Sequence, residues 1–175
     1  MTTGSSTLDE IGFTGLLKAG QHAWMNLKDR ILAEKDPVRQ DAVRRSATQS
    51  KYFLGSVHAV TEKGQLVVGS GTGSQIAAYS YEADNVILVV GAQKVTSDPD
   101  EAMAGLRSHS YALEDARMKA LGYPGANLPK ILIWENERKR SVNVILVNEK
   151  LGFWRTVGAN ACRSAPGHDG RRQPS

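Results

Sequence analysis

The chain has 175 residues, one cysteine and a formal net charge of +4. This length suits a single domain with its own hydrophobic core. One cysteine excludes an internal disulfide and any cluster held by several cysteines of this chain. Four arginines against one aspartate place +3 of the charge in residues 151–175, which leaves +1 for residues 1–150. No aromatic residues alternate with the basic clusters, so we expect no nucleic-acid binding.

Hydropathy gives no sign of a membrane protein. No apolar stretch approaches the roughly 18 residues of a membrane span, and the first residues lack a charged region followed by an apolar run. A single cysteine fits a reducing compartment. We therefore expect a cytoplasmic protein that does not bind membranes.

A polar loop of Gly4, Ser5, Ser6 and Thr7 leads into the first predicted helix. Thr7 and Glu10 have the spacing of a capping box, in which each side chain accepts a hydrogen bond from a free backbone N–H group. The loop is a candidate ligand-binding element, and helix capping is the alternative explanation for Thr7.

A helical arm is predicted over about residues 21–50. Trp24, Leu27, Ile31 and Leu32 are expected to form one buried stripe. The pair Asp36-Pro37 interrupts the arm, because proline is favoured in the first turn of a new helix.

The stretch 57–75 dominates the sequence. Two apolar runs flank Glu62-Lys63-Gly64, a pattern that predicts a strand, a short turn and a second strand. A glycine-rich loop follows and leads into a predicted helix. Glycines expose backbone N–H groups, and a helix start adds partial positive charge, so this loop is suited to a phosphate or a carboxylate. Its candidate ligand-binding residues are Gly71, Thr72, Gly73, Ser74 and Gln75.

The glycine spacing of this loop matches neither a Walker motif nor the dinucleotide-binding fingerprint. A strand-to-helix turn that needs glycine only for its geometry is the alternative. Two such loops in one small domain could face the same ligand, but the sequence does not show whether they converge.

Residues 85–90 form a continuous apolar run rich in β-branched side chains, which is typical of a strand covered on both faces in a parallel sheet. Lys94 follows this strand and is placed to reach a ligand at the carboxyl edge of the sheet. A solvent-exposed loop lysine is the alternative.

A helix is predicted from Asp98 to Leu121, with acidic residues in its first turn. Strands at 130–135 and 141–147 are most simply an antiparallel hairpin with a charged, solvated tip at 136–140. Residues 154–175 are predicted to be disordered. The four histidines form no metal motif, and His58 is expected to be a packed or edge residue.

Several motifs in the same order resemble the LUD domain family of lactate-utilisation proteins. They are residues 52–66, 71–75 and 89–95, the opening motif at 4–12, and the ending at 144–153. The resemblance covers about residues 1–153. It implies an α/β fold, a mixed sheet with helices on both faces, like that of ribose-phosphate isomerases and coenzyme A transferases.

The resemblance also implies a link with the oxidation of L-lactate to pyruvate. Some relatives carry cysteine clusters that this chain lacks, so an iron–sulfur redox partner protein is expected, and a homo-oligomer is a further expectation; no cofactor is assigned. Relatives have a helix and a strand before the opening motif, and we therefore expect an uncovered sheet edge.

Three functions follow as hypotheses. In the first, the domain is an enzyme for an anionic metabolite, with Glu62 as acid–base residue by analogy of fold; a simple turn residue is the alternative for Glu62. The second is a non-catalytic binding or regulatory subunit that needs a redox partner. The third is an isomerase or transferase acting on a sugar phosphate or an acyl substrate.

Overall fold

The strands divide between two sheets in the computed structural model, which describes residue 1 and residues 4–153. The first sheet is entirely parallel and has the order β1-β4-β7; the second is mixed and has the order β5-β2-β3-β6. The strands are β1 (Tyr52–Gly55), β2 (Ala59–Thr61), β3 (Leu66–Ser70), β4 (Asn85–Gly91), β5 (Val95–Thr96), β6 (Lys130–Trp134) and β7 (Ser141–Val147).

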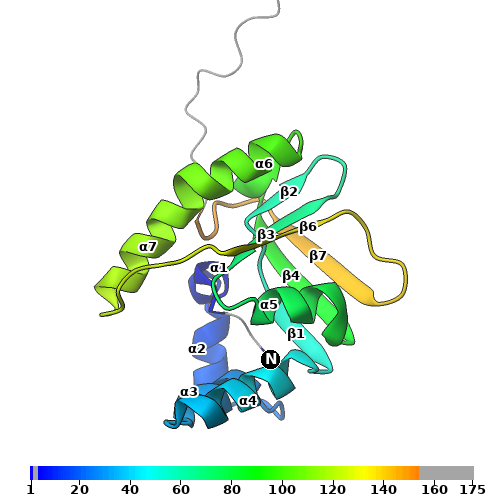
Figure 1. Cartoon of the computed structure of the whole chain (residues 1–175). Coiled ribbons are helices and arrows are strands. Elements are labelled where there is room, and N and C mark those ends of the chain that lie inside the picture. Colours follow the sequence, from blue (N-terminus) through cyan, green and yellow to red (C-terminus); the bar gives the residue numbers. More distant parts are fainter. Residues whose placement is uncertain (2–3, 154–175) are drawn as a thin grey trace, which may run out of the picture.

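Helices surround these sheets. In Figure 1 the helix α6 lies at the top of the view, α7 at the left, and α3 and α4 at the bottom. The α-helices are α1 (Ser6–Glu10), α2 (Phe13–Lys18), α3 (Leu27–Ala33), α4 (Pro37–Thr48), α5 (Ser74–Ala77), α6 (Pro99–Gly105) and α7 (Tyr111–Ala120). The π-helical turns are η1 (Ala78–Glu82) and η3 (Leu106–Ser110), and η2 (Ala92–Lys94) is a 3-10 turn.

The predicted α/β class is confirmed. The apolar run at 85–90 made this class predictable from the sequence. It forms β4, the central strand of the parallel sheet, with Val86, Leu88 and Val90 fully buried. Phe53 and Tyr79 pack against it with their rings edge to face. A strand covered on both faces must be apolar throughout, so this element was readable from sequence. The strands form two sheets where we expected one mixed sheet.

The β2–β3 hairpin is also confirmed. Its strands pair antiparallel, and Gly64 takes a positive φ of 87° in the turn. By contrast, the predicted hairpin of residues 130–135 and 141–147 is wrong. The two segments lie in different sheets, because β6 pairs antiparallel with β3 and β7 pairs parallel with β4.

Arg140 anchors the segment in which the chain passes from β6 in one sheet to β7 in the other. Its guanidinium donates to the carbonyls of Ala78 and Ala83, both at 3.2 Å, and to that of Tyr79 at 2.5 Å. It also lies 5.6 Å from the ring centroid of Trp134. The expectation of a wholly solvated tip is therefore wrong for Arg140, which ties the crossing segment to η1.

Two helices, α3 and α4, lie in the region predicted as a helical arm, although α3 begins only at Leu27, and α4 begins at the predicted Asp36-Pro37 break. Asp36 accepts a hydrogen bond from the Arg39 backbone N–H at 2.8 Å, with Pro37 at the first position of α4. The buried stripe is wrong, since Ile31 is buried but Trp24 is 63% exposed and Leu32 59%. The arm packs mainly helix on helix, so the periodic apolar residues do not all reach a core.

The capping box is wrong as well. Ser5 occupies the N-cap position of α1 without a side-chain hydrogen bond, and Thr7 lies inside the helix. Glu10 instead accepts a hydrogen bond from the Gly152 backbone N–H at 2.7 Å. Both side chains therefore serve tertiary contacts, which a local motif does not reveal.

The C-terminal strap, residues 148–153, crosses the end of β4. The Ala92 N–H donates to the Glu149 carbonyl at 3.1 Å, and the Gln93 side chain donates to the Leu151 carbonyl at 2.7 Å. The strap returns the chain to α1 through Glu10. The predicted disordered tail, residues 154–175, lies outside the described residues.

Gly91 is expected to tolerate no side chain where the strap crosses β4. A Cβ atom there would lie 2.6 Å from the Leu151 nitrogen and 2.8 Å from the Glu149 oxygen, both of which are backbone atoms. Gly91→Ala should therefore lower the free energy of unfolding by about 1–3 kcal/mol, the usual cost of overpacking. Urea unfolding would measure this, and an unchanged midpoint would contradict the close crossing.

Candidate functional site

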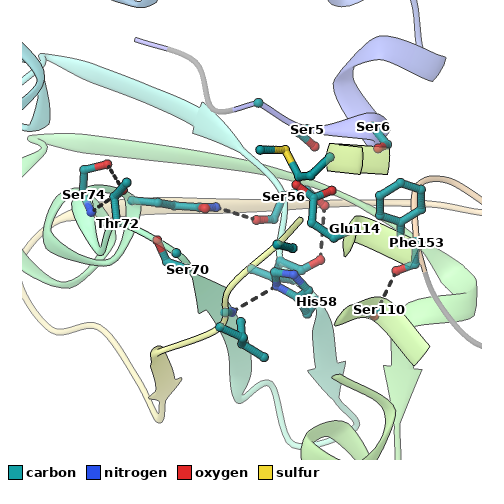
Figure 2. A pocket seen from close by; sticks show the side chains of 18 of the residues that line it. Ser5, Ser6, Ser56, His58, Ser70, Thr72, Ser74, Ser110, Glu114 and Phe153 are labelled. Atoms are coloured by element: carbon teal, nitrogen blue, oxygen red, sulfur yellow. Dashed lines mark hydrogen bonds between the residues drawn. The ribbon is translucent and has the colours of Figure 1, made fainter. Parts of the chain in front are cut away.

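The two predicted loops converge on one cavity of about 430 Å³. Figure 2 shows Ser5 and Ser6 of the first loop on one side, Ser70, Thr72 and Ser74 on another, Ser56 between them and His58 below. The predicted residues that line this cavity are Gly4, Ser5, Ser6, Thr7, Gly71, Thr72, Ser74, Gln75 and Lys94. The sequence could not show this convergence, because 64 positions separate Thr7 from Gly71.

Gly73 is the predicted loop residue that does not line this cavity. It has a positive φ of 87° at the N-cap of α5 and lines an adjoining hollow with Lys130. Its N–H donates to the Ser70 hydroxyl at 3.0 Å, and the Ser74 N–H donates to the Thr72 hydroxyl at 3.4 Å. These two amides are used within the loop and are not available to a ligand.

Lys94 is the buried cation of the cavity. Its side chain is only 3% exposed, although the sequence left a solvated lysine open. The ammonium donates to the Thr7 hydroxyl at 3.0 Å, to the Ser56 hydroxyl at 3.1 Å and to the Val57 carbonyl at 3.1 Å. None of these partners carries a negative charge, and no carboxylate of the described residues lies within ion-pair distance of Lys94.

Burial lowers the pKa of Lys94 from 10.5 to about 8, while the more distant charge of Glu10 opposes the change. Desolvation disfavours the charged form of an amine, so the direction is the expected one. Lys94 is still mostly protonated at pH 7. An incompletely compensated buried cation of this kind stabilises an anion placed beside it.

His58 lines the same cavity and is half-buried. Its Nδ1 accepts a hydrogen bond from the Gly69 backbone N–H at 3.1 Å. Burial, with a smaller effect from the charge of Lys94, lowers the pKa of His58 to about 4. The imidazole is therefore neutral at physiological pH. The prediction of a packed residue is half right, since the ring is held by backbone but also faces the cavity.

Further cations line the cavity at its rim. Lys28 and Arg44 join Lys94, against Glu114 as the one lining carboxylate among the described residues. Glu114 is paired with Arg117 at 2.6 Å. Burial is the main cause that lowers the pKa of Lys28. The side chain of Lys28 makes no hydrogen bond or ion pair within the described part of the chain, and the charges of Asp9 and Asp29 oppose the lowering of its pKa.

Glu62 is not brought to this cavity. It is exposed in the turn between β2 and β3, where its backbone N–H donates to the Thr96 carbonyl at 2.8 Å. The catalytic role predicted for Glu62 came from analogy of fold, and nothing in the geometry of the cavity supports it.

Sequence reasoning missed Lys28, Arg44, Ser56 and Glu114 as lining residues. They come from α3, α4, the end of β1 and α7, elements far apart in the chain. No local pattern marks them. His58 had one usable signal, its position immediately before the hairpin strand β2, but its partner is the backbone N–H of Gly69 on β3.

The described residues contain no group of three or more His, Cys, Asp or Glu side chains suited to a metal ion. Within the same part of the chain, no helix combines the length and apolar character that crossing a membrane requires. The polar groups of the cavity that bear on its function are therefore its cations and hydroxyl groups.

The fold and the site together define a class of protein: an α/β domain in which two glycine-containing loops meet at a cavity lined by cations. The family model of the LUD domain matches residues 1–122. This is more than half of the chain, which therefore belongs to the LUD domain family, of the lactate-utilisation type. Residues 123–153, also included in the resemblance, lie beyond the match. Searches of curated proteins and of solved structures gave no match.

Proposed function

We propose that the cavity binds a small anionic metabolite, a carboxylate or a phosphate, and that the protein acts in the oxidation of L-lactate to pyruvate. The observation that carries this proposal is Lys94, a buried cation whose three hydrogen-bond partners are all uncharged. Lys28 and Arg44 add positive charge at the rim. An anion in the cavity would compensate a charge that the fold buries at a cost.

The redox step of such a reaction needs an electron acceptor. A chain with one cysteine holds no cysteine-ligated iron–sulfur cluster by itself. We therefore propose that an iron–sulfur partner protein takes the electrons. In this role the domain binds the anion and orients it for the partner.

A non-catalytic binding subunit is the second candidate, favoured by one observation. The lining carboxylate Glu114 is held by Arg117 through two hydrogen bonds, at 2.7 and 2.6 Å. A carboxylate engaged in this way is a poor general base. Turnover by the isolated protein with an artificial electron acceptor would distinguish an enzyme from a binding subunit.

Anion binding is tested by thermal unfolding with L-lactate, pyruvate, ribose 5-phosphate and inorganic phosphate. A ligand at about a hundred times its Kd should add about 2.7 kcal/mol to the free energy of unfolding. Lys28→Gln should weaken binding several-fold, because it removes a rim charge. Lys35→Gln is the matched control, since Lys35 is exposed and does not line the cavity. A melting temperature unchanged by every anion would reject the proposal.

A further inference from the structure

The backbone of β3 determines which nitrogen of His58 carries the proton. The Gly69 N–H points at Nδ1, and an amide can only donate. Nδ1 must therefore offer its lone pair, and the proton of the neutral ring lies on Nε2. Nε2 has no hydrogen-bond partner among the described residues. It is not among their fully buried unpaired atoms either, so it opens to the cavity as a donor.

Lys94 determines in the same way that the Thr7 hydroxyl oxygen is an acceptor towards it. An ammonium group has three N–H bonds and no lone pair, and its partners here are Thr7, Ser56 and Val57. The Thr7 oxygen accepts from it, so the Thr7 hydroxyl proton must point elsewhere. That proton has no acceptor within the described residues. The Ser56 proton does, in the Val57 carbonyl at 3.3 Å.

The strap closes this corner of the cavity. Gly152 has a positive φ of 70°, and a Cβ atom there would lie close to the Thr7 hydroxyl and 3.1 Å from the Lys94 ammonium nitrogen. A residue without a side chain is needed at this position, which leaves the corner to Thr7 and Lys94. Figure 2 shows the side chains of Ser56, His58 and Glu114, and Ser56 is joined to this corner because its hydroxyl accepts from Lys94 at 3.1 Å.

We propose that the Nε2–H of His58 and the hydroxyl of Thr7 form a donor-only subsite for a ligand oxygen that carries negative charge and no proton. We place there the oxygen on C2 of a 2-oxo acid, as the ketone or the enolate; in oxalate a carboxylate oxygen takes the same position. This inference rests on the proposed function, because it assumes that an anion occupies the cavity. It adds that the site recognises the 2-oxo acid more strongly than the corresponding 2-hydroxy acid.

The physical reason is the hydroxyl proton of a 2-hydroxy acid. A keto or enolate oxygen accepts from both donors and leaves nothing unpaired. A hydroxyl oxygen also accepts, but its own proton then faces the two donors of the subsite, while the lining carboxylate Glu114 is already engaged by Arg117. A buried unpaired donor is unfavourable. Sites that mismatch a substrate polar group in this way discriminate strongly. Oxalate, which offers acceptor oxygens only, should bind best of the simple probes.

The tautomer is tested first, without any ligand. Long-range ¹⁵N–¹H correlation spectra of the protein labelled at histidine should show the Nε2–H form for His58, assigned with a His58→Asn variant. The signal should not titrate between pH 5 and pH 8. An Nδ1–H tautomer, or a titration midpoint near 6.5, would overturn the proposal whatever the protein binds.

Binding of oxalate, pyruvate and L-lactate is then measured by calorimetry. His58→Asn keeps an oxygen that accepts from Gly69 but removes the Nε2 donor, whereas His58→Gln keeps a donor at similar reach. Thr7→Val removes the hydroxyl, and Thr7→Ser keeps it. We expect His58→Asn and Thr7→Val each to weaken oxalate binding roughly tenfold to a hundredfold. His58→Gln and Thr7→Ser should retain most of the affinity.

The outcomes separate the two proposals. Oxalate and pyruvate binding at least tenfold tighter than L-lactate, with that preference lost in Thr7→Val, supports the subsite. Equal affinities for the three probes, or no effect of either donor deletion, overturns it and leaves anion binding intact. Binding of phosphate alone has the same meaning. No binding of any anion overturns the proposed function and the subsite together.

Discussion

Replacing Lys94 by methionine is expected to raise the melting temperature of the ligand-free protein and to abolish anion binding. Burial that moves a lysine pKa from 10.5 to about 8 corresponds to about 3 kcal/mol of destabilisation at pH 7. Methionine fills similar space without a charge, although it leaves Thr7 and Ser56 without their donor. We expect a net gain of about 1–2 kcal/mol, or roughly 2–8 °C.

The pH dependence of this effect has a definite sign. Between pH 8 and pH 10.5 the unfolded state binds more protons at Lys94 than the folded state, so this group makes the protein more stable as pH rises through that window. The charged groups that face it do not reverse this sign. Glu10 of α1 opposes the lowered pKa of Lys94, and His58 stays neutral because its own pKa is about 4.

Urea unfolding of the wild type and Lys94→Met at pH 7, 8, 9 and 10 checks the prediction. The advantage of the variant should be largest at pH 7 and should shrink as the pH approaches 10. Lys51→Met, at an exposed position, is the control and should change little. A variant less stable than the wild type at pH 7 would show that Lys94 stabilises the fold, and the case for a charge held for function would fail.

Arg140→Met is expected to destabilise the protein by roughly 3–4 kcal/mol and to lower the melting temperature by about 10 °C. Arg140 donates to three carbonyls of the η1 region and pairs with Glu137 at 2.6 Å. The variant removes the guanidinium donor from all three buried carbonyls, of which that of Ala78 keeps the Ala83 backbone N–H at 3.2 Å. It also removes the cation beside the Glu137 carboxylate. The pKa of Glu137 is lowered to about 2, first because the carboxylate accepts from the Lys139 backbone N–H and second because it accepts from Arg140.

The control for Arg140 lies two residues away. Arg138→Met removes the same charge from the same segment, but Arg138 is exposed, so its effect should stay within about 0.5 kcal/mol. Denaturant unfolding of the two variants measures the difference. Similar midpoints for both would mean that Arg140 does not anchor the crossing between the sheets.

Local features were readable from sequence where a short segment decides them. The apolar run of β4, the Gly64 turn and the cap at Asp36 each depend on a few adjacent residues. The motifs that identified the LUD domain family are local in the same sense. The prediction of a β6–β7 hairpin was wrong because a strand pairs with any strand that has an unpaired edge. β3 and β4 both had such an edge, and they pair with β6 and β7 respectively.

The candidate site shows the same division. The sequence by itself determined the two glycine loops and Lys94 at the end of an apolar strand, because glycine spacing and strand periodicity are properties of neighbouring residues. Only the tertiary structure decided that both loops meet, that Lys94 is buried beside Thr7, and that His58 faces the cavity. The physical reason is that burial and donor polarity depend on groups far along the chain, such as the Gly69 N–H and the strap at Gly152, which no local pattern encodes.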